Sequence, residues 1–261
     1  MFGDVRVVEA SIQSIVMRNQ KKIRNFFDNL APIYGKNFVG DKSGKSYEFN
    51  KRKDIVAKVT SGHTGELLDC ASGTGEITAE VLKEGNYESA VVCDLSGRML
   101  SYARKNIEIA IPHTEVTYAE ADIFVYSSEC NAKFDIILCL GLVAHVGQLG
   151  GLLRRLYSIL KPGGVVVLQS SLSQHWGLKL VRLLSSKKWK KKNGYELSFY
   201  STKEINDIAS QSGFRIVGSY RYCIGFPYGD HLSKYGNYCL EVALEKIASR
   251  MGSECIFVLA Q

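Results

Sequence analysis

The chain has 261 residues, 46% of them hydrophobic, which is enough to bury one sizeable core, or one core with a small cap. Its formal net charge of +7 falls to +2 without the five lysines of residues 187–192, so the basicity is local and no general surface for nucleic acid is indicated. No segment reaches the roughly 18 apolar residues of a membrane span, and charged residues interrupt the N-terminal segment, so we expect a cytoplasmic protein without a membrane anchor or signal peptide.

The seven cysteines favour reduced thiols. Their number is odd, and neither a C-x-x-C pair nor a histidine at metal-ligand spacing accompanies them. Four of them stand in expected apolar strands, where cysteine packs as a small hydrophobic residue: Cys70, Cys93, Cys139 and Cys255. We therefore expect neither disulfides nor a bound metal.

The first expected element is an amphipathic helix over residues 9–30, which Pro32 ends. This helix either packs on the main domain as part of the core or covers a ligand as a lid, and both interpretations stay open. A loop (33–38), a polar connector (41–47) and a short helix (50–60) follow. Residues 1–60 are thus expected to form an N-terminal helical lid.

The segment 67–76 is the first with a ligand-binding pattern. Two leucines indicate a buried strand, Gly73 and Gly75 allow positive φ and a close approach of the backbone, and a helix resumes directly afterwards. Free backbone N–H groups at such a helix start lie at the positive end of the helix dipole. The segment therefore predicts a platform for a polar or anionic small molecule.

Strand and helix patterns then alternate about five times along the chain. The expected strands lie at residues 89–94, 115–120, 133–140 and 165–169, and the expected helices at 96–104, capped by Ser96, and at 149–160, ended by Lys161-Pro162-Gly163-Gly164. This order predicts an α/β fold with a parallel sheet, helices on both faces and right-handed crossovers.

Acidic residues end three successive strands, namely Asp69, Asp94 and Asp122. Asp94 follows the glycine loop by roughly twenty residues, the spacing at which a carboxylate meets the ribose hydroxyls of a bound nucleoside. Each acid could instead cap a helix or form a turn. Because ligands of parallel sheets bind at the carboxyl ends of the strands, three such acids favour one binding crevice, which also contains residues 140–145.

The C-terminal part is less regular. A capping box at Ser201 starts a helix that ends near Gly213, a strand covers residues 214–220, an amphipathic helix lies within 235–251 and a final strand covers 255–260. The last two strands are expected to close the sheet as an edge pair. Within a single domain that spans residues 1–261, the segments 171–200 and 221–250 are expected to cap an acceptor pocket.

Five ordered motifs carry a family resemblance: Leu68–Gly75, Val92–Ser96 with Met99-Leu100, Ala121–Ile123, Phe134–Ile137 and Leu160–Gly164. Together they resemble a class I S-adenosylmethionine-dependent methyltransferase of the small-molecule type. The match covers about residues 26–170 by motif and the rest by element order. The resemblance implies a Rossmann-like, seven-stranded, mostly parallel sheet whose last strand is antiparallel, with helices on both faces, the N-terminal lid and a small cap insertion.

The resemblance also implies S-adenosylmethionine as the cofactor. Gly73 and Gly75 would let the backbone pass close to the methionine part, while Asp69 would order that loop. Ala71, followed by Ser72, stands where the family most often has its first glycine, and its methyl group fits if the local φ is negative.

The remaining cofactor contacts are likewise implied by position. Asp94 would accept hydrogen bonds from both ribose hydroxyls, and Leu95 and Met99 would pack on the adenine. Asp122 would accept from the adenine amino group, with the N–H of Ile123 beside it. Tyr34 of the lid would lie near the sulfonium, and Leu140 would lie under the cofactor.

Three histidines are candidates for a general base: His145 after the fourth strand, and His175 and His231 in the cap segments. The first could instead be structural support, as is frequent in the resembled family, and the other two could be surface histidines. An aromatic wall of the acceptor pocket is expected from Trp176, Tyr195, Phe199, Tyr200, Tyr222, Phe226 and Tyr228. The lysine run around Trp189 is interpreted as a solvated loop.

We expect methyl transfer to a small-molecule acceptor, at oxygen first and at carbon or nitrogen next. A dinucleotide-dependent oxidoreductase is one alternative, but Thr78 stands where the third glycine of a dinucleotide loop belongs. A non-catalytic protein that binds S-adenosylmethionine is another. The family's asparagine-proline type motif is absent after the fourth strand, which counts against nucleic acid as a substrate, and a homodimer is compatible with the sequence.

Overall fold

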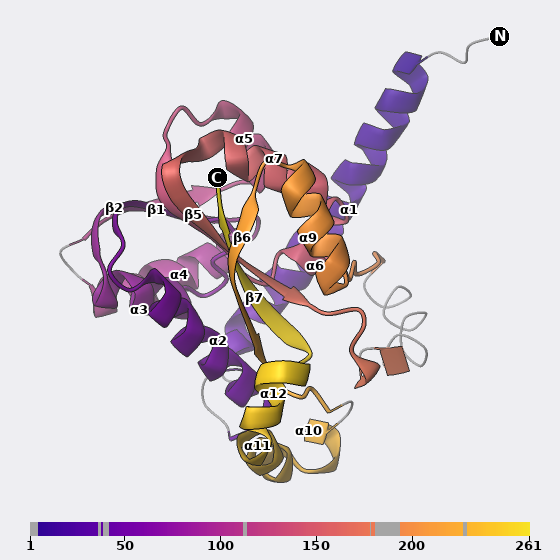
Figure 1. Ribbon diagram of the computed structural model, residues 1–261. Coiled ribbons are helices and arrows are strands. Elements are labelled where there is room, and N and C mark those ends of the chain that lie inside the picture. The colour runs from indigo at the N-terminus through magenta and orange to yellow at the C-terminus, as the bar shows by residue number, and fades with distance from the viewer. Residues whose placement is uncertain are drawn as a thin grey trace.

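A computed structural model describes residues 5–35, 38, 42–111, 114–177, 179–180, 194–226 and 229–261, with the backbone alone for 5–19 and 232. Seven strands form one sheet in the order β3-β2-β1-β4-β5-β7-β6 (Figure 1). The strands are β1 (Thr64–Asp69), β2 (Asn86–Asp94), β3 (Glu115–Glu120), β4 (Phe134–Cys139), β5 (Leu160–Ser171), β6 (Arg215–Tyr222) and β7 (Glu254–Ala260). Among the described strands β7 alone runs in the opposite direction to all the others, and it lies between β5 and β6. This confirms the mostly parallel sheet with an antiparallel last strand.

Helices cover both faces of the sheet. They are α1 (Val5–Gly35), α2 (Gly44–Thr60), α3 (Glu76–Glu84), α4 (Gly97–Ala110), α5 (Ile123–Glu129), α6 (Val143–Val146), α7 (Leu149–Ile159), α9 (Thr202–Gln211), α10 (Gly229–Leu232), α11 (Lys234–Ala243) and α12 (Glu245–Met251). The side chains of α2, α3 and α4 pack on one face, and those of α5, α7 and α9 on the other. The helices α10 to α12 gather at one end of the molecule beside α2 (Figure 1).

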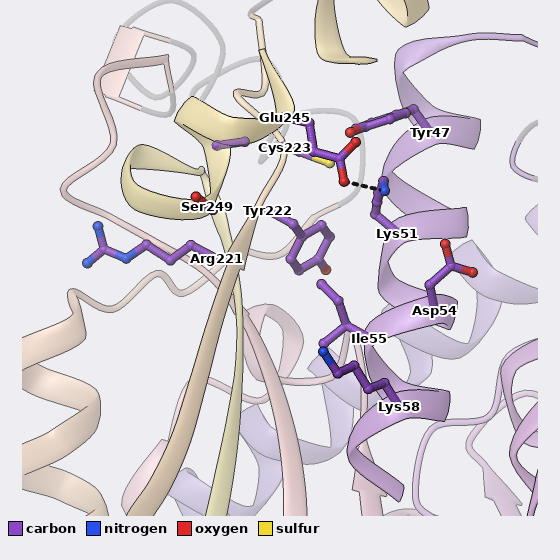
Figure 2. A pocket seen from close by; sticks show the side chains of 11 residues that line it. Tyr47, Lys51, Asp54, Ile55, Lys58, Arg221, Tyr222, Cys223, Glu245 and Ser249 are labelled. Atoms are coloured by element: carbon purple, nitrogen blue, oxygen red, sulfur yellow. Dashed lines mark hydrogen bonds and ion pairs between the residues drawn. The ribbon is translucent and has the colours of Figure 1, made fainter. Parts of the chain in front are cut away.

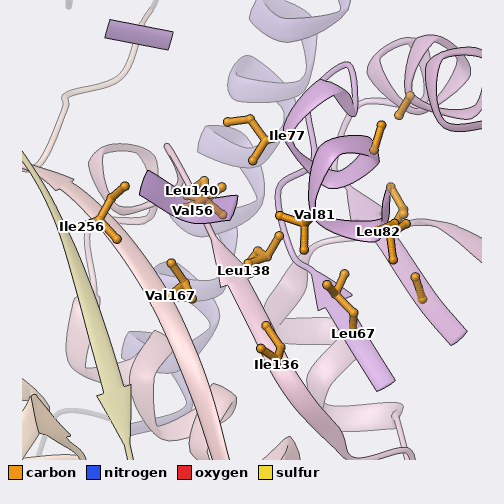
Figure 3. Packing of buried hydrophobic residues seen from close by; sticks show 14 of the residues in the cluster. Val56, Leu67, Ile77, Val81, Leu82, Ile136, Leu138, Leu140, Val167 and Ile256 are labelled. Atoms are coloured by element: carbon orange, nitrogen blue, oxygen red, sulfur yellow. The ribbon is translucent and has the colours of Figure 1, made fainter. Parts of the chain in front are cut away.

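The central strands are continuous apolar runs because their side chains pack into two cores, one on each face of the sheet. Successive side chains of a strand point to opposite faces. Leu67 and Ile136 therefore pack under α2 and α3 (Figure 3), while Leu68 and Ile137 pack under α7, and all four are fully buried. Each such side chain contributes about 1.5–3 kcal/mol by leaving water. The two cores hold the strand ends, and hence the crevice, in a fixed position.

The end of α1 differs from the expectation. We predicted that Pro32 ends the helix, whereas α1 continues to Gly35 with Pro32 inside it. A proline lacks the backbone N–H that bonds to the carbonyl four residues earlier. Pro32 therefore removes one bond, to the carbonyl of residue 28, and α1 continues for three more residues, so Tyr34 remains helical.

The start of α2 also differs. The polar connector predicted for residues 41–47 is wrong for the described part, since α2 begins at Gly44 rather than near Asn50. Ser43 caps the helix, and the side chain of Ser46 returns a hydrogen bond to the Ser43 N–H at 2.9 Å. This is a capping box with serine in place of the usual glutamate or glutamine. The early start adds Glu48 to the same helix as Arg52.

Three further differences concern the second half. β5 begins at Leu160, so the glycines 163–164 lie within the strand, where its pairing with β4 is irregular. The single helix expected within 235–251 is divided into α11 and α12 at Leu244. The lysine run with Trp189 lies outside the described residues, as does most of the apolar segment before it.

All seven cysteines lie within the described ranges and are free, in agreement with the expected reduced thiols. Within those ranges, no helix combines the length and the apolar character that crossing a membrane requires.

Candidate functional site

The loop between β1 and α3 requires glycine at one of its positions. Gly75 precedes α3 with a φ of 80°, and a Cβ at this residue would lie 2.9 Å from the Cα of Ala103. Gly73 also has a positive φ, of 55°, but no atom lies within 4 Å of its missing Cβ. Among the described residues other than glycine only Cys223 has a positive φ, so the methyl group of Ala71 is accommodated without strain. The predicted glycine turn is thus confirmed.

Asp69 joins this loop to α3 at the end of β1. Its Oδ1 accepts a hydrogen bond from the Ala71 N–H at 3.3 Å, and its Oδ2 accepts one from the Thr78 hydroxyl at 2.5 Å. Burial raises the pKa of Asp69 to about 6, although both hydrogen bonds oppose the shift. The carboxylate is therefore engaged with the protein itself on both oxygens.

Asp94 connects the end of β2 to the same loop. Its Oδ2 accepts a hydrogen bond from the Gly73 N–H at 2.9 Å, and its Oδ1 accepts one from the Ser96 N–H at 2.8 Å. Burial raises the pKa of Asp94 to about 6, against the effect of these bonds. Each carboxylate oxygen has a second lone pair, so the side chain retains acceptor capacity for a ligand.

Asp122 stands at the third strand end and caps α5. Its Oδ1 accepts a hydrogen bond from the Phe124 N–H at 2.7 Å, as a helix cap does. Its Oδ2 accepts a second one at 2.8 Å from the side chain of Gln20, which belongs to α1. The first helix therefore reaches the acidic strand ends.

Two further contacts tie α1 to this part of the crevice. The Nε of Arg24 donates to the carbonyl of Leu95 at 3.0 Å, and the hydroxyl of Ser96 donates to Asp28 at 2.5 Å. Together with Gln20, these residues place α1 beside the positions that the resemblance assigned to the nucleoside. Of the other assigned residues, Met99 and Ile123 are buried and Leu95 is half-buried.

A small cavity lies where the lid, the glycine loop and β4 meet. It encloses about 40 Å³. Its lining residues are Tyr34, Phe49, Arg52, Asp69, Ala71, Ser72, Gly73, Glu76, Ile77 and Leu140. This space holds a few waters but not a nucleoside. The hydroxyl of Ser72 is buried there without a partner among the described residues, so it can hydrogen-bond to a polar group of a ligand.

Four lining residues were not foreseen from the sequence. Phe49 and Arg52 come from the part of α2 around its expected start, and Glu76 and Ile77 are the first two residues of α3. The spacing of Glu48 and Arg52, four apart on one helix, was a usable signal for a paired arginine, and their side chains are 2.6 Å apart. The proximity of Arg52 to Gly141 and to the glycine loop could not be predicted from the local sequence pattern.

His145 lies in α6 behind the end of β4. Its Nδ1 is 3.2 Å from the Tyr195 hydroxyl, and its ring packs edge-on against Phe27 of α1 at 5.1 Å. Burial lowers the pKa of His145 to about 4, so the ring is neutral at pH 7. The structure thus brings this histidine, the lid helix and one residue of the expected aromatic wall together.

The other two histidines lie elsewhere. His175 is buried, and its Nδ1 accepts a hydrogen bond from the Gly177 N–H at 3.2 Å. Burial also lowers the pKa of His175, and its ring packs against Trp176, which in turn contacts Phe226. His231 is exposed on α10. Tyr228 lies outside the described residues, and Tyr222 lies apart from this aromatic group, on the α2 side of the sheet.

A larger groove of about 350 Å³ runs between α2 and the end of β6 (Figure 2). Its charges are mixed and partly paired, since Lys51 lies 2.5 Å from Glu245. Figure 2 shows the ring of Tyr222 between β6 and α2 at this groove. None of the residues assigned to the cofactor lines the groove within the described part of the chain, so its size does not mark it as the reaction site.

Residues 67–164 match the model of the family described as "Methyltransferase domain". Over these residues the chain is similar to a methyltransferase domain, and its sheet has the Rossmann-like methyltransferase fold. The matched range starts in β1 and ends in β5, so it contains the glycine loop and all three acidic strand ends.

Solved structures share this fold. The magnesium protoporphyrin IX methyltransferase from Synechocystis PCC 6803, with bound SAH, superposes with a TM-score of 0.64 at 15% identity over 93% of this chain and 100% of that one. The cyclopropane synthase MmaA2 from Mycobacterium tuberculosis gives a TM-score of 0.59 at 17% identity over 82% and 84%. The similarity covers most of this chain, so its fold is a known one.

Two curated relatives match part of this chain in sequence. The ubiquinone/menaquinone biosynthesis C-methyltransferase from Geotalea daltonii is 29% identical over 161 residues, 57% of this chain and 62% of the relative. The tRNA 5-carboxymethoxyuridine methyltransferase from Escherichia coli is 24% identical over 144 residues, 54% of each chain. The match spans less than two thirds of either relative.

Proposed function

We propose that this protein transfers a methyl group from S-adenosylmethionine to a small-molecule acceptor, with oxygen as the first candidate atom and carbon or nitrogen as the next. The observation that carries the proposal is the cavity shared by the glycine loop and Tyr34, with Asp94 hydrogen-bonded to Gly73 of that loop. The name of the Geotalea daltonii relative, a C-methyltransferase, supports a small acceptor and keeps carbon among the candidates.

The residues present fit the cofactor. Gly75 allows the close backbone approach, Asp94 keeps free lone pairs, and the unpartnered hydroxyl of Ser72 offers a further polar contact. Asp94, Leu95 and Asp122 would hold the nucleoside, and Gly73 with Tyr34 the methionine end. When bound, the cofactor supplies an electrophilic methyl group on a sulfonium.

The rest of the task falls to this chain. The protein has to align the acceptor with the methyl group and exclude water, and for a hydroxyl acceptor it must also take up a proton. Because the cavity below Tyr34 encloses about 40 Å³, the lid formed by α1 has to move before a nucleoside enters. The contacts of Gln20, Arg24 and Asp28 are those that must open.

His145 is our first candidate for the proton acceptor, because its neutral ring lies next to the lid and the end of β4. A pKa near 4 makes it a weak base, so its role requires that the entering acceptor change the surroundings of the ring. In His175 the Nδ1 already accepts a hydrogen bond, and His231 is exposed, so they rank second and third.

Calorimetric titration of the full chain with S-adenosylhomocysteine (SAH) tests the proposal. Asp94→Asn keeps the size of the side chain but removes its charge and one acceptor oxygen, so we expect at least a tenfold weaker affinity, as for a lost charge-assisted hydrogen bond. Glu88→Gln is the control, since Glu88 is an exposed acid on the same strand. Absence of SAH binding, or equal affinity of both variants, would contradict the proposal, and a preference for NAD or NADP would favour the oxidoreductase alternative.

A further inference from the structure

A row of polar side chains crosses three neighbouring strands on the face covered by α2. Gln169 of β5, Glu254 of β7 and Tyr222 of β6 are all buried. Val167 and Ile256, two residues away on their strands, belong to the core beneath α2 (Figure 3), so the row lies on this face. Polar residues at three adjacent buried positions are unusual for a sheet interior and call for an explanation.

The row is continuous with the end of β4. The Gly141 N–H donates to the Oε1 of Gln169 at 2.7 Å, and the Nε2 of Gln169 donates to Glu254. On the side of α2, the Nη1 atom of Arg52 lies 3.8 Å from the position that a Cβ on Gly141 would take. Leu140, which precedes Gly141, lines the cavity of the glycine loop together with Arg52. The row therefore reaches the cavity of the glycine loop, where the proposed function would place the methyl group.

Two donors in this cluster lack partners. The Nε of Arg52 and the hydroxyl of Tyr222 are buried, and neither has a hydrogen bond to any described residue. Burial lowers the pKa of Arg52, but its neighbours, with Tyr222 first, raise it by more, so the two groups lie close together. A buried donor without a partner costs about 1–3 kcal/mol. Because the Nε of arginine can only donate, the missing partner is an acceptor atom.

A structural role explains only part of the cluster. The bond between Gln169 and Glu254 joins β5 to β7, and the pair of Arg52 with Glu48 at 2.6 Å lies within α2. They leave the two donors unsatisfied, which a purely structural network avoids. The arrangement instead keeps the Nε–H of the guanidinium available.

The charge of the cluster allows a second anion at Arg52. Burial, followed by the charge of Glu48, raises the pKa of Glu254 to about 8, so this carboxyl group is mostly neutral at pH 7. Glu48 contacts the Nη2 of Arg52 at 2.6 Å. A planar guanidinium has five N–H donors, and this contact leaves the Nε–H for another carboxylate.

Tyr222 is held by a strained turn. Cys223, the next residue, has a φ of 56°, in the left-handed region that favours glycine. The buried carboxylate of Glu241 accepts the N–H groups of Ile224 at 2.7 Å and Gly225 at 2.8 Å. Such strain costs about 1–3 kcal/mol and persists only where the surroundings enforce it, as is frequent at ligand sites. The turn fixes the phenol next to Arg52.

We propose that the Nε of Arg52 and the hydroxyl of Tyr222 bind a carboxylate group of the methyl acceptor, so that the acceptor is an acidic small molecule. This inference rests on the proposed function. The methionine carboxylate of the cofactor is a second source of the same chemistry, because Arg52 also lines the cavity of the glycine loop. We assign the site to the acceptor because of the strand order. Asp94 ends β2, in one half of the sheet, whereas the other half, from β4 to β6, provides Gly141, Gln169, Glu254 and Tyr222.

Calorimetry on the full chain saturated with SAH tests the assignment. The probes are benzoate and acetate, and the matched neutral controls are benzamide and acetamide. We expect the carboxylates to bind and the amides to bind at least tenfold more weakly. We further expect Arg52→Gln to abolish the preference and Tyr222→Phe to reduce it about threefold, while Lys58→Gln, which removes an exposed cation from the same helix, leaves it unchanged.

A parallel titration separates the two carboxylate sources. The ligands are SAH and 5′-deoxy-5′-methylthioadenosine, which lacks the amino acid part. If Arg52→Gln weakens SAH but not methylthioadenosine, Arg52 holds the cofactor and the assignment to the acceptor is overturned. Equal binding of carboxylates and amides in the wild type also overturns it, whereas a failure of SAH itself to bind refutes the proposed function. Arg52→Lys, which keeps the charge but not the Nε edge, replaces Arg52→Gln if that variant does not fold, and loss of the preference is again expected.

Discussion

Gly75 stands where the loop after β1 becomes α3, and two features of its position exclude a side chain. Its φ is 80°, and a Cβ would lie 2.9 Å from Ala103 of α4. Gly73 has only the first of these features, because open space surrounds its missing Cβ. The two glycines therefore allow strain and crowding to be separated.

We expect Gly75→Ala to destabilise the fold by about 2–4 kcal/mol and Gly73→Ala by about 1 kcal/mol. Both substitutions force an alanine into the left-handed conformation, but only the first pushes a methyl group into α4. Urea unfolding of the two variants measures the difference. Equal losses of stability would show that the contact with Ala103 does not matter.

Asp69 gives a pH dependence whose sign follows from its environment. Its pKa is about 6 in the folded protein, because of burial, and about 3.9 in an unfolded chain. Between pH 4 and pH 6 the folded state holds a proton that the unfolded state has released. The free energy of unfolding therefore falls as the pH rises through this window, by up to about 3 kcal/mol from this group.

The expected result is a difference between two profiles. Asp69→Asn has a similar shape but does not titrate, so the stability of the wild type relative to this variant should be higher at pH 4 than at pH 7. Urea unfolding at a series of pH values gives the comparison and cancels the other titrating groups. Parallel profiles would mean that the pKa of the Asp69 carboxyl group does not differ between the folded and the unfolded state.

At the scale of elements, α1 is the part whose contacts bear most directly on ligand entry. Gln20 and Asp28 bond to Asp122 and Ser96, respectively. Each bond is worth about 0.5–1.5 kcal/mol, somewhat more where a charge takes part. The double variant Gln20→Ala with Asp28→Asn should therefore open the helix about tenfold more often.

Amide hydrogen exchange followed by mass spectrometry measures this opening without a ligand. We expect faster exchange in the peptides that cover residues 20–35, and no change in those of β4. Lys21→Ala is the matched control, because Lys21 is an exposed residue of the same helix. Unchanged exchange in the double variant would mean that other contacts hold α1 in place.

The same scale shows why some elements were predictable and others were not. Strands such as β4 are continuous apolar runs because both faces are covered, and this pattern is written in the local sequence. The start of α2 depends on a capping box in which Ser46 replaces the usual acid or amide, so the local signal was weak. Pro32 misled because a proline disfavours a helix without excluding it, and α1 continues for three residues beyond it.

At the scale of the whole molecule, the candidate site divides into a predictable half and an unpredictable one. The glycine loop and the acids at 69, 94 and 122 follow one another in sequence order along parallel strands, so topology alone brings them together. The cluster around Arg52 draws on Gln169, Tyr222 and Glu254, which are separated by up to about two hundred residues. Such contacts result from the strand order β5-β7-β6 and leave no periodic pattern.

That strand order also determines when the molecule is completed during its synthesis. Among the described strands β6 pairs only with β7, so residues 215–222 cannot join the sheet until residues 254–260 have left the ribosome. The nascent chain can form the half of the sheet around β1 and β4, which carries the glycine loop, earlier. The arginine cluster forms only in the final step, so a chain interrupted before Glu254 would retain the glycine loop and lack the proposed acceptor site.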